Sequence, residues 1–245
     1  MTVIAVCSAK HSPGATTLAL ALVTAWASKT ARADTPPVLV EADPSGGDLA
    51  ARLGLGADPG LVSMAAAARH PSSDIDLIGH AQPLPCGGMA ILGPSNPDQA
   101  EAAVAALASR LSSGLGKLGC GVIDCGRWGR GSAASDAMRG ADLTLVVVRP
   151  DVAGIAHARE RIDTLRAAAD RRLGVVLVGE RPYGVQSVMD TLGHSMVMTV
   201  SVDRDGAQML LGRARARSAW RSQLVRSARS VLDAAEASPV ARAMA

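Results

Sequence analysis

Short apolar runs alternate with longer Ala-rich segments along most of the chain. The runs are rich in Val, Ile and Leu, a pattern typical of strands buried on both faces of a sheet. They predict strands at residues 3–7, 37–41, 120–124, 143–148, 175–178 and 196–200. The Ala-rich segments predict helices at residues 15–29, 98–111, 152–169 and 185–192. This alternation predicts an α/β fold, a doubly wound, mostly parallel sheet with helices on both faces.

Residues 77–94 interrupt the alternation. Two apolar pieces there surround Pro83, Pro85 and the Gly87-Gly88 pair. Because proline has no N–H to donate and glycine pairs favour tight turns, we expect a hairpin or an edge strand beside the parallel set. The chain shows no internal repeat and no long linker, so residues 1–245 are predicted to form a single domain.

Composition narrows the class of protein. Hydrophobic residues make up 48% of the chain and charged residues 19%, which excludes disorder. The chain has no Phe and one Tyr, so its core must consist of aliphatic side chains.

No apolar run approaches the roughly 20 residues needed to cross a bilayer, and we expect a soluble, cytoplasmic protein. Four cysteines without a C-x-x-C pair indicate free thiols in a reducing compartment: Cys7, Cys86, Cys120 and Cys125.

The first predicted strand leads through S-A-K-H-S-P-G-A-T-T directly into the first predicted helix. In such a turn, main-chain N–H groups and the helix N-terminus point at a phosphate, and a hydroxyl on the first helical turn reaches Mg²⁺. Gly14 permits the close approach and Thr16 supplies the hydroxyl. Lys10 lies in this turn and is one of three lysines in the chain. The alternative is that Lys10 caps a surface turn.

Two further predicted strands end near acidic residues, Asp43 after the second and Asp124 at the end of the third. The carboxyl ends of parallel strands face the ligand crevice of an open sheet, where a carboxylate can hold Mg²⁺ through water. Each feature has a structural alternative. The D-P-S-G segment from Asp43 is also a good generic turn, Asp48 a good helix N-cap, and an apolar strand that ends in Asp-x-Gly is often structural.

Residues 10–17 resemble the deviant Walker A motif K-G-G-x-G-K-T-T of the ParA/MinD group of P-loop ATPases, with matches at Lys10, Gly14, Thr16 and Thr17. The resemblance implies ATP and Mg²⁺ as cofactors. It also implies a homodimer in which Lys10 reaches the partner's phosphates. The nucleotide-binding residues would be Lys10, His11, Ser12, Pro13, Gly14, Ala15, Thr16 and Thr17. Lys10 and Asp43 would take catalytic roles, Asp43 by orienting water, and Thr16 and Asp124 would hold the metal.

The motif also departs from the family pattern. In this chain His11 and Ser12 replace the two early glycines of the family motif, and Ala15 replaces the usual P-loop lysine. Glu41 replaces the first Asp of the D-x-D-P segment. Loss of one charge-assisted phosphate contact costs about 1.5–3 kcal/mol, so we expect weak nucleotide binding and at most slow ATP hydrolysis. The retained G-A-T-T resembles the CpaE/TadZ branch, which localises pilus-assembly machinery. Gly179 and the V-S-V-D segment at 200–203 leave adenine recognition open.

The implied function is a dimerising switch that positions chromosomes, plasmids, or secretion or pilus machinery together with a partner protein. The alternative is a pseudo-ATPase scaffold that localises partners without turnover. Whether the protein is an enzyme stays open at this stage.

The C-terminal region is basic. A helix predicted at about 213–236 carries an apolar stripe of Trp220, Leu224, Ala228, Val231 and Leu232. Its arginines could bind DNA phosphates nonspecifically, or form an ordinary solvated face: Arg213, Arg215, Arg217, Arg221, Arg226 and Arg229. We expect that a partner protein would recruit this protein to the nucleoid or to a membrane. The other histidines lack metal-ligand spacing and are assigned to surface or core: His70, His80, His157 and His194.

Overall fold

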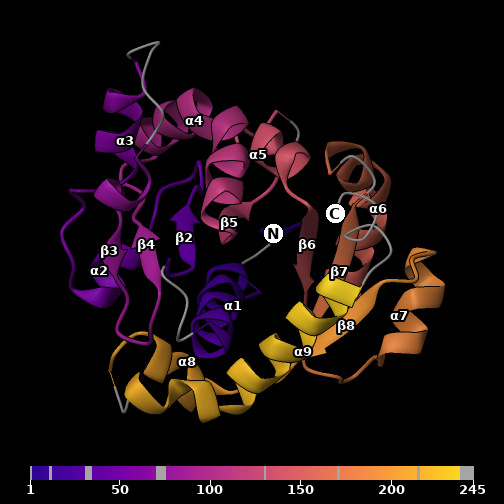
Figure 1. Cartoon of the computed structure of the whole chain (residues 1–245). Helices are drawn as coiled ribbons and strands as arrows, with labels where there is room; N and C mark the ends of the chain where they lie inside the picture. The colour runs from indigo at the N-terminus through magenta and orange to yellow at the C-terminus, as the bar shows by residue number, and fades with distance from the viewer. Residues whose placement is uncertain are drawn as a thin grey trace.

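The computed structural model describes residues 2–10, 13–30, 35–69, 76–129, 131–169, 172–213 and 216–237. Its centre is a sheet with the strand order β3-β4-β2-β5-β1-β6-β7-β8 (Figure 1). The strands are β1 Thr2–Ser8, β2 Val38–Glu41, β3 Gln82–Pro83, β4 Met89–Ile91, β5 Cys120–Arg127, β6 Leu143–Val148, β7 Leu173–Val178 and β8 Val197–Val200. Only β3 is antiparallel to its neighbour, so the predicted doubly wound, mostly parallel sheet is confirmed.

Helices cover both faces of this sheet. They are α1 Ala15–Lys29, α2 Leu49–Leu53, α3 Leu61–Ala67, α4 Pro97–Leu118, α5 Ser135–Gly140, α6 Val152–Ala168, α7 Val185–Leu192, α8 Arg204–Leu210 and α9 Gln223–Ala237, with short 3₁₀ helices η1 Ile78–His80 and η2 Ala216–Arg221. Alternate residues of β1 enter two cores: Ala5 and Cys7 face the side of α3 to α7, whereas Ile4 and Val6 face α1, α8 and α9 (Figure 1).

The strand order reverses at β1, which lies between β5 and β6. Ligands of open α/β sheets bind at such a switch point, beyond the carboxyl ends of the strands. The register places candidate residues there, because Val6 of β1 and Glu41 of β2 both pair with Asp124 of β5. The topology therefore brings the end of β1, where the predicted phosphate turn (residues 10–17) begins, beside the end of β5, with the end of β2 next along the sheet.

Residues 77–94 form the predicted edge hairpin. β3 and β4 are antiparallel, and the Leu84 N–H donates to the Gly88 carbonyl across the turn at 3.0 Å. Gly88 has a φ of 82° and lies close to Val23 and Pro37, so a side chain would not fit there. This hairpin ends the sheet on one side with a two-residue strand.

Helix lengths differ from prediction in places. α4 continues to Leu118 instead of ending at residue 111, although the added segment contains serines and glycines. Leu115 is fully buried, and Gly114 lies where a Cβ would press on Leu77. Packing therefore outweighs weak helix propensity. The short helices α2, α3, α5 and α8 were not predicted, since five to seven residues are too few to show a clear 3.6-residue period.

The predicted C-terminal helix at 213–236 begins too early. Its true start is Gln223, because the Ser222 hydroxyl accepts the Val225 N–H and the Asp203 carboxylate accepts the Leu224 N–H, both at 3.1 Å. Leu224, Ala228, Val231 and Leu232 are buried as predicted. Trp220 is not part of the buried stripe, because its side chain is 43% exposed with the Arg221 guanidinium 4.5 Å from its ring centroid.

The C-terminal arginines have different settings. Arg213, Arg221 and Arg226 are exposed, whereas Arg229 donates to the Ser28 hydroxyl at 2.8 Å. Arg215 and the side chain of Arg217 lie outside the described residues. The same helix carries Asp233 and Glu236, which pair with Lys29 of α1, so its surface is of mixed charge.

Two remaining properties concern membranes and thiols. Among the described helices, none combines the length and apolar character required to cross a bilayer. All four cysteines are free; Cys7 and Cys125 are buried, and Cys86 and Cys120 are half-buried.

Candidate phosphate-binding site

The phosphate turn joins β1 to α1 at the switch point of the sheet. Gly14 has a φ of 109°, in the left-handed region that favours glycine, and its carbonyl accepts the Leu18 N–H at 2.8 Å to open the helix. Thr16 and Thr17 follow on the first turn of α1 and are half-buried. Strand, turn and helix thus stand in the predicted order. His11 and Ser12 lie outside the described residues, so their binding role stays a prediction.

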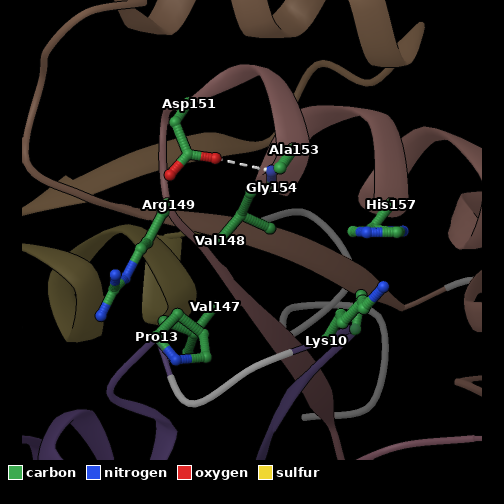
Figure 2. Close-up of a pocket in the computed structure, with 10 residues that line it drawn as sticks. Lys10, Pro13, Val147, Val148, Arg149, Asp151, Ala153, Gly154 and His157 are labelled. Carbon is green, nitrogen blue, oxygen red and sulfur yellow. Dashed lines mark hydrogen bonds between the residues drawn. The ribbon is translucent and has the colours of Figure 1, made fainter.

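The two ends of the turn differ in charge. Ala15 is 7% exposed and packs into the core cluster around α1, so no cation occupies the usual position of the P-loop lysine. Lys10 is exposed and lines two pockets. The first, of about 210 Å³, lies between the turn and the start of α6, where Lys10 extends toward His157 (Figure 2). His157 was assigned to surface or core; it is half-buried and lines this pocket.

The second pocket that Lys10 lines has a volume of about 500 Å³. Its walls include Pro44 and Ser45 of the turn after β2, together with Arg127 at the end of β5 and Arg161 of α6. The structure thus brings Lys10 beside the segment that contains Asp43.

Asp124 is the most deeply buried acid of the site, with 1% of its surface exposed. Its Oδ1 accepts the Gly126 N–H at 3.0 Å, but its buried Oδ2 has no hydrogen-bond partner among the described residues. Burial raises the pKa of Asp124 to about 6, while the nearby Thr16 hydroxyl and the Gly126 N–H act in the opposite direction. An orphaned buried oxygen is costly, and here it lies beside Thr16, the other predicted metal ligand. Oxygen donors of this kind fit Mg²⁺.

The Asp43 carboxyl group packs against Gly126, and Gly126 follows Asp124 by two residues. Its Oδ1 accepts the Ser45 N–H at 2.8 Å, and its carbonyl accepts the Gly46 N–H, so the predicted turn is present. Burial raises the pKa of Asp43, and its charge in turn raises the pKa of Asp124. The two carboxylates are therefore neighbours, as an arrangement around one bound group requires.

Gly126 is needed for this contact. It has a φ of 59°, and a Cβ at this position would overlap the Asp43 carboxyl group. We predict that Gly126→Ala lowers the free energy of unfolding by about 1–3 kcal/mol, because alanine is strained in the left-handed region and Asp43 must move. Gly129→Ala is the matched control, since nothing lies within 4 Å of its would-be Cβ. Chemical denaturation measures both, and equal stabilities of the two variants would contradict the prediction.

Glu41 does not face the phosphate turn. It is 2% exposed, and its Oε1 accepts the N–H groups of Asp48 and Leu49 at 2.8 and 2.9 Å, while Oε2 accepts the Gly93 N–H at 2.9 Å. Glu41 therefore caps α2 from the neighbouring strand. Asp48, expected as the N-cap side chain, instead pairs with Arg52 at 2.8 Å. Burial raises the pKa of Glu41 to about 7 against the lowering effect of these three donors.

A third pocket, of about 240 Å³, flanks the start of α1. Pro13, Gly14 and Thr17 form its side toward the phosphate turn, and Val178, Val200 and Val202 give it apolar walls. Asp203 also lines it, but its two carboxylate oxygens already accept the Gly206 and Leu224 N–H groups. This pocket could hold a flat apolar group next to a phosphate in the turn.

Three arginines at the site were not singled out from the sequence. Arg127 and Arg149 come at or just after the carboxyl ends of β5 and β6, and Arg161 of α6 donates to the Ala9 carbonyl at the start of the turn. The sequence could have indicated Arg127 and Arg149, because residues at the ends of parallel strands face the ligand crevice. Arg161 had no such signal, since its approach to Ala9 depends on tertiary packing.

Comparisons with known proteins identify the architecture. Neither a protein-family model nor a curated protein sequence matches the chain. Among solved structures, a ParA family ATPase from Chlorobium tepidum is similar with a TM-score of 0.72 and 17% identity, covering 97% of this chain and 99% of that one. The cell division ATPase MinD of Pyrococcus furiosus gives a TM-score of 0.71 and 19% identity over 95% and 99%.

A third similar structure is septum site-determining protein MinD from Pyrococcus horikoshii, complexed with Mg-ADP. It gives a TM-score of 0.70 and 18% identity, covering 95% of this chain and 96% of that one. Identities this low establish the architecture alone. This chain therefore has the ParA/MinD-like P-loop fold, in which the predicted phosphate turn connects β1 to α1.

Proposed function

We propose that this protein is a nucleotide-dependent positioning switch that binds ATP with Mg²⁺ at the phosphate turn and acts as a homodimer. The observation that carries the proposal is the orphaned Oδ2 of Asp124, buried next to the Thr16 hydroxyl at the switch point of a ParA/MinD-like fold. A buried carboxylate oxygen without a donor is expensive, and a cation offsets that cost.

Each residue of the site has a proposed role. The main-chain N–H groups within residues 10–17, where Pro13 has none to offer, and the N-terminus of α1 hold the phosphates. Thr16 and Asp124 hold Mg²⁺, which neutralises phosphate charge when bound. No described group of three His, Cys, Asp or Glu side chains could hold a metal by itself, so phosphate oxygens complete the coordination. Lys10, exposed at the mouth of two pockets, reaches the phosphates of a second copy. Asp43 orients the attacking water.

Hydrolysis is expected to be slow. Ala15 gives the phosphates no cation, and the Glu41 carboxylate is fully engaged with main-chain N–H groups. The same two observations favour a second candidate, a scaffold of the CpaE/TadZ type that localises its partner without turnover. In either case a partner protein of a localisation or secretion system completes the function. DNA binding through the exposed Arg213, Arg221 and Arg226 stays a prediction.

The proposal is tested by titrating the purified protein with ATP in the presence of Mg²⁺ or EDTA. We expect binding that strengthens with Mg²⁺, together with a shift from monomer to dimer in sedimentation velocity. Absence of ATP binding at millimolar concentration would exclude the switch. Phosphate release then separates the two candidates: turnover that disappears in Asp43→Ala identifies an enzyme, and ATP binding without turnover identifies the scaffold.

A further inference from the structure

Arg149 lies where two pockets meet at the phosphate turn. It follows β6 directly and lines the first pocket with Lys10 and the third pocket with Gly14 and Thr17. Pro13 and Arg149 are the two residues that these pockets share. A residue that lines both pockets next to the turn is well placed to contact a phosphate that the turn holds.

The Arg149 guanidinium has no partner among the residues that the structure describes. Its side chain is exposed, and within the described residues no hydrogen bond or ion pair holds it. The acid nearest to it in sequence, Asp151, accepts the Gly154 N–H with its Oδ1 at 2.7 Å and caps α6 (Figure 2). By contrast, Arg161 donates to the Ala9 carbonyl and Arg52 pairs with Asp48.

The main chain below this side chain is fixed. Val148 pairs with Leu177 in the sheet, and α6 begins so close to Arg149 that a Cβ at position 154 would overlap the Arg149 carbonyl. The guanidinium is therefore carried by a rigid strand end, which reduces the conformational entropy lost when it binds a ligand.

We propose that Arg149 is a phosphate-binding residue that supplies the positive charge missing at Ala15. The inference rests on the proposed nucleotide function and assigns the cation of that site. A guanidinium presents several N–H donors in a planar fork and can bind two phosphate oxygens at once, so it can replace an ammonium group that approaches from another element.

The test measures ATP affinity with Mg²⁺ in the wild type, Arg149→Ala, Arg149→Lys and Arg159→Ala. Arg159 is an exposed arginine on α6 that lines none of the three pockets, so its variant controls for net charge. We expect Arg149→Ala to weaken ATP binding about ten- to a hundredfold, Arg149→Lys to retain most of the affinity, and Arg159→Ala to match the wild type. Competition by inorganic pyrophosphate should weaken in Arg149→Ala by a similar factor. Thermal unfolding checks that every variant is folded.

The outcomes separate this inference from the function on which it rests. If the wild type binds no ATP, the proposed function and this inference both fail. If the wild type binds and Arg149→Ala binds within about twofold of it, only the role of Arg149 fails. That role also fails if Arg159→Ala weakens binding as much as Arg149→Ala does, or if pyrophosphate competes equally well in Arg149→Ala and the wild type.

Discussion

Glu41→Ala is expected to lower the free energy of unfolding by about 2–5 kcal/mol. The Glu41 carboxylate accepts three main-chain N–H groups, of which those of Leu49 and Gly93 are buried. A buried donor left without an acceptor costs about 1–3 kcal/mol, and the alanine supplies no replacement. Urea denaturation followed by circular dichroism measures the change. The loss is expected to loosen α2 and the loop around Gly93 together, because a single side chain holds both.

Two matched variants make this prediction specific. Glu101→Ala removes an exposed glutamate from α4 and should stay within about 0.5 kcal/mol of the wild type. Glu41→Gln keeps an oxygen for Asp48 and Leu49 but turns an amide donor toward the Gly93 N–H, so its stability should fall between those of the wild type and Glu41→Ala. Equal stability of Glu41→Ala and Glu101→Ala would show that the three N–H groups find other acceptors.

The sequence was most informative where local pattern and chain order agree. Each predicted strand corresponds to an observed one, because runs such as residues 143–148 are apolar throughout and bounded by helical segments. Gly14 and Thr16 could be placed at the phosphate turn for the same reason, since strand, turn and helix follow each other without interruption. The neighbourhood of Asp43 and Asp124 followed from a general property of parallel sheets, in which strand ends share one edge.

Other features depend on contacts between distant segments. Glu41 ends β2 two residues before Asp43, and the sequence alone does not reveal that its side chain accepts the N–H groups of Asp48, Leu49 and Gly93. Trp220 has the helical spacing of a buried residue, but the chain enters α9 only at Gln223, so the spacing misleads. Arg149 lines two pockets that are formed by segments far apart in the sequence, which no local pattern reveals.

A large pH effect is expected from Asp124 in the metal-free protein. Burial raises its pKa to about 6 in the folded state, against an ordinary value of 3.8, so the folded protein holds a proton between these values that the unfolded chain has lost. The free energy of unfolding should therefore fall by on the order of 3 kcal/mol as the pH rises from about 4 to 7.

Asp124→Asn removes this titrating group and should flatten that part of the stability profile, although Glu41, whose pKa is raised to about 7, still contributes a decline in the same direction. Urea denaturation in EDTA at several pH values measures the difference between the two profiles, and parallel profiles would contradict the prediction. The same variant should lose the Mg²⁺ dependence of ATP affinity, since its amide no longer offers a charged oxygen beside Thr16. Together the two measurements relate the cost of burying Asp124 to its proposed use: the carboxylate that weakens the empty protein near neutral pH is the one that a bound cation stabilises.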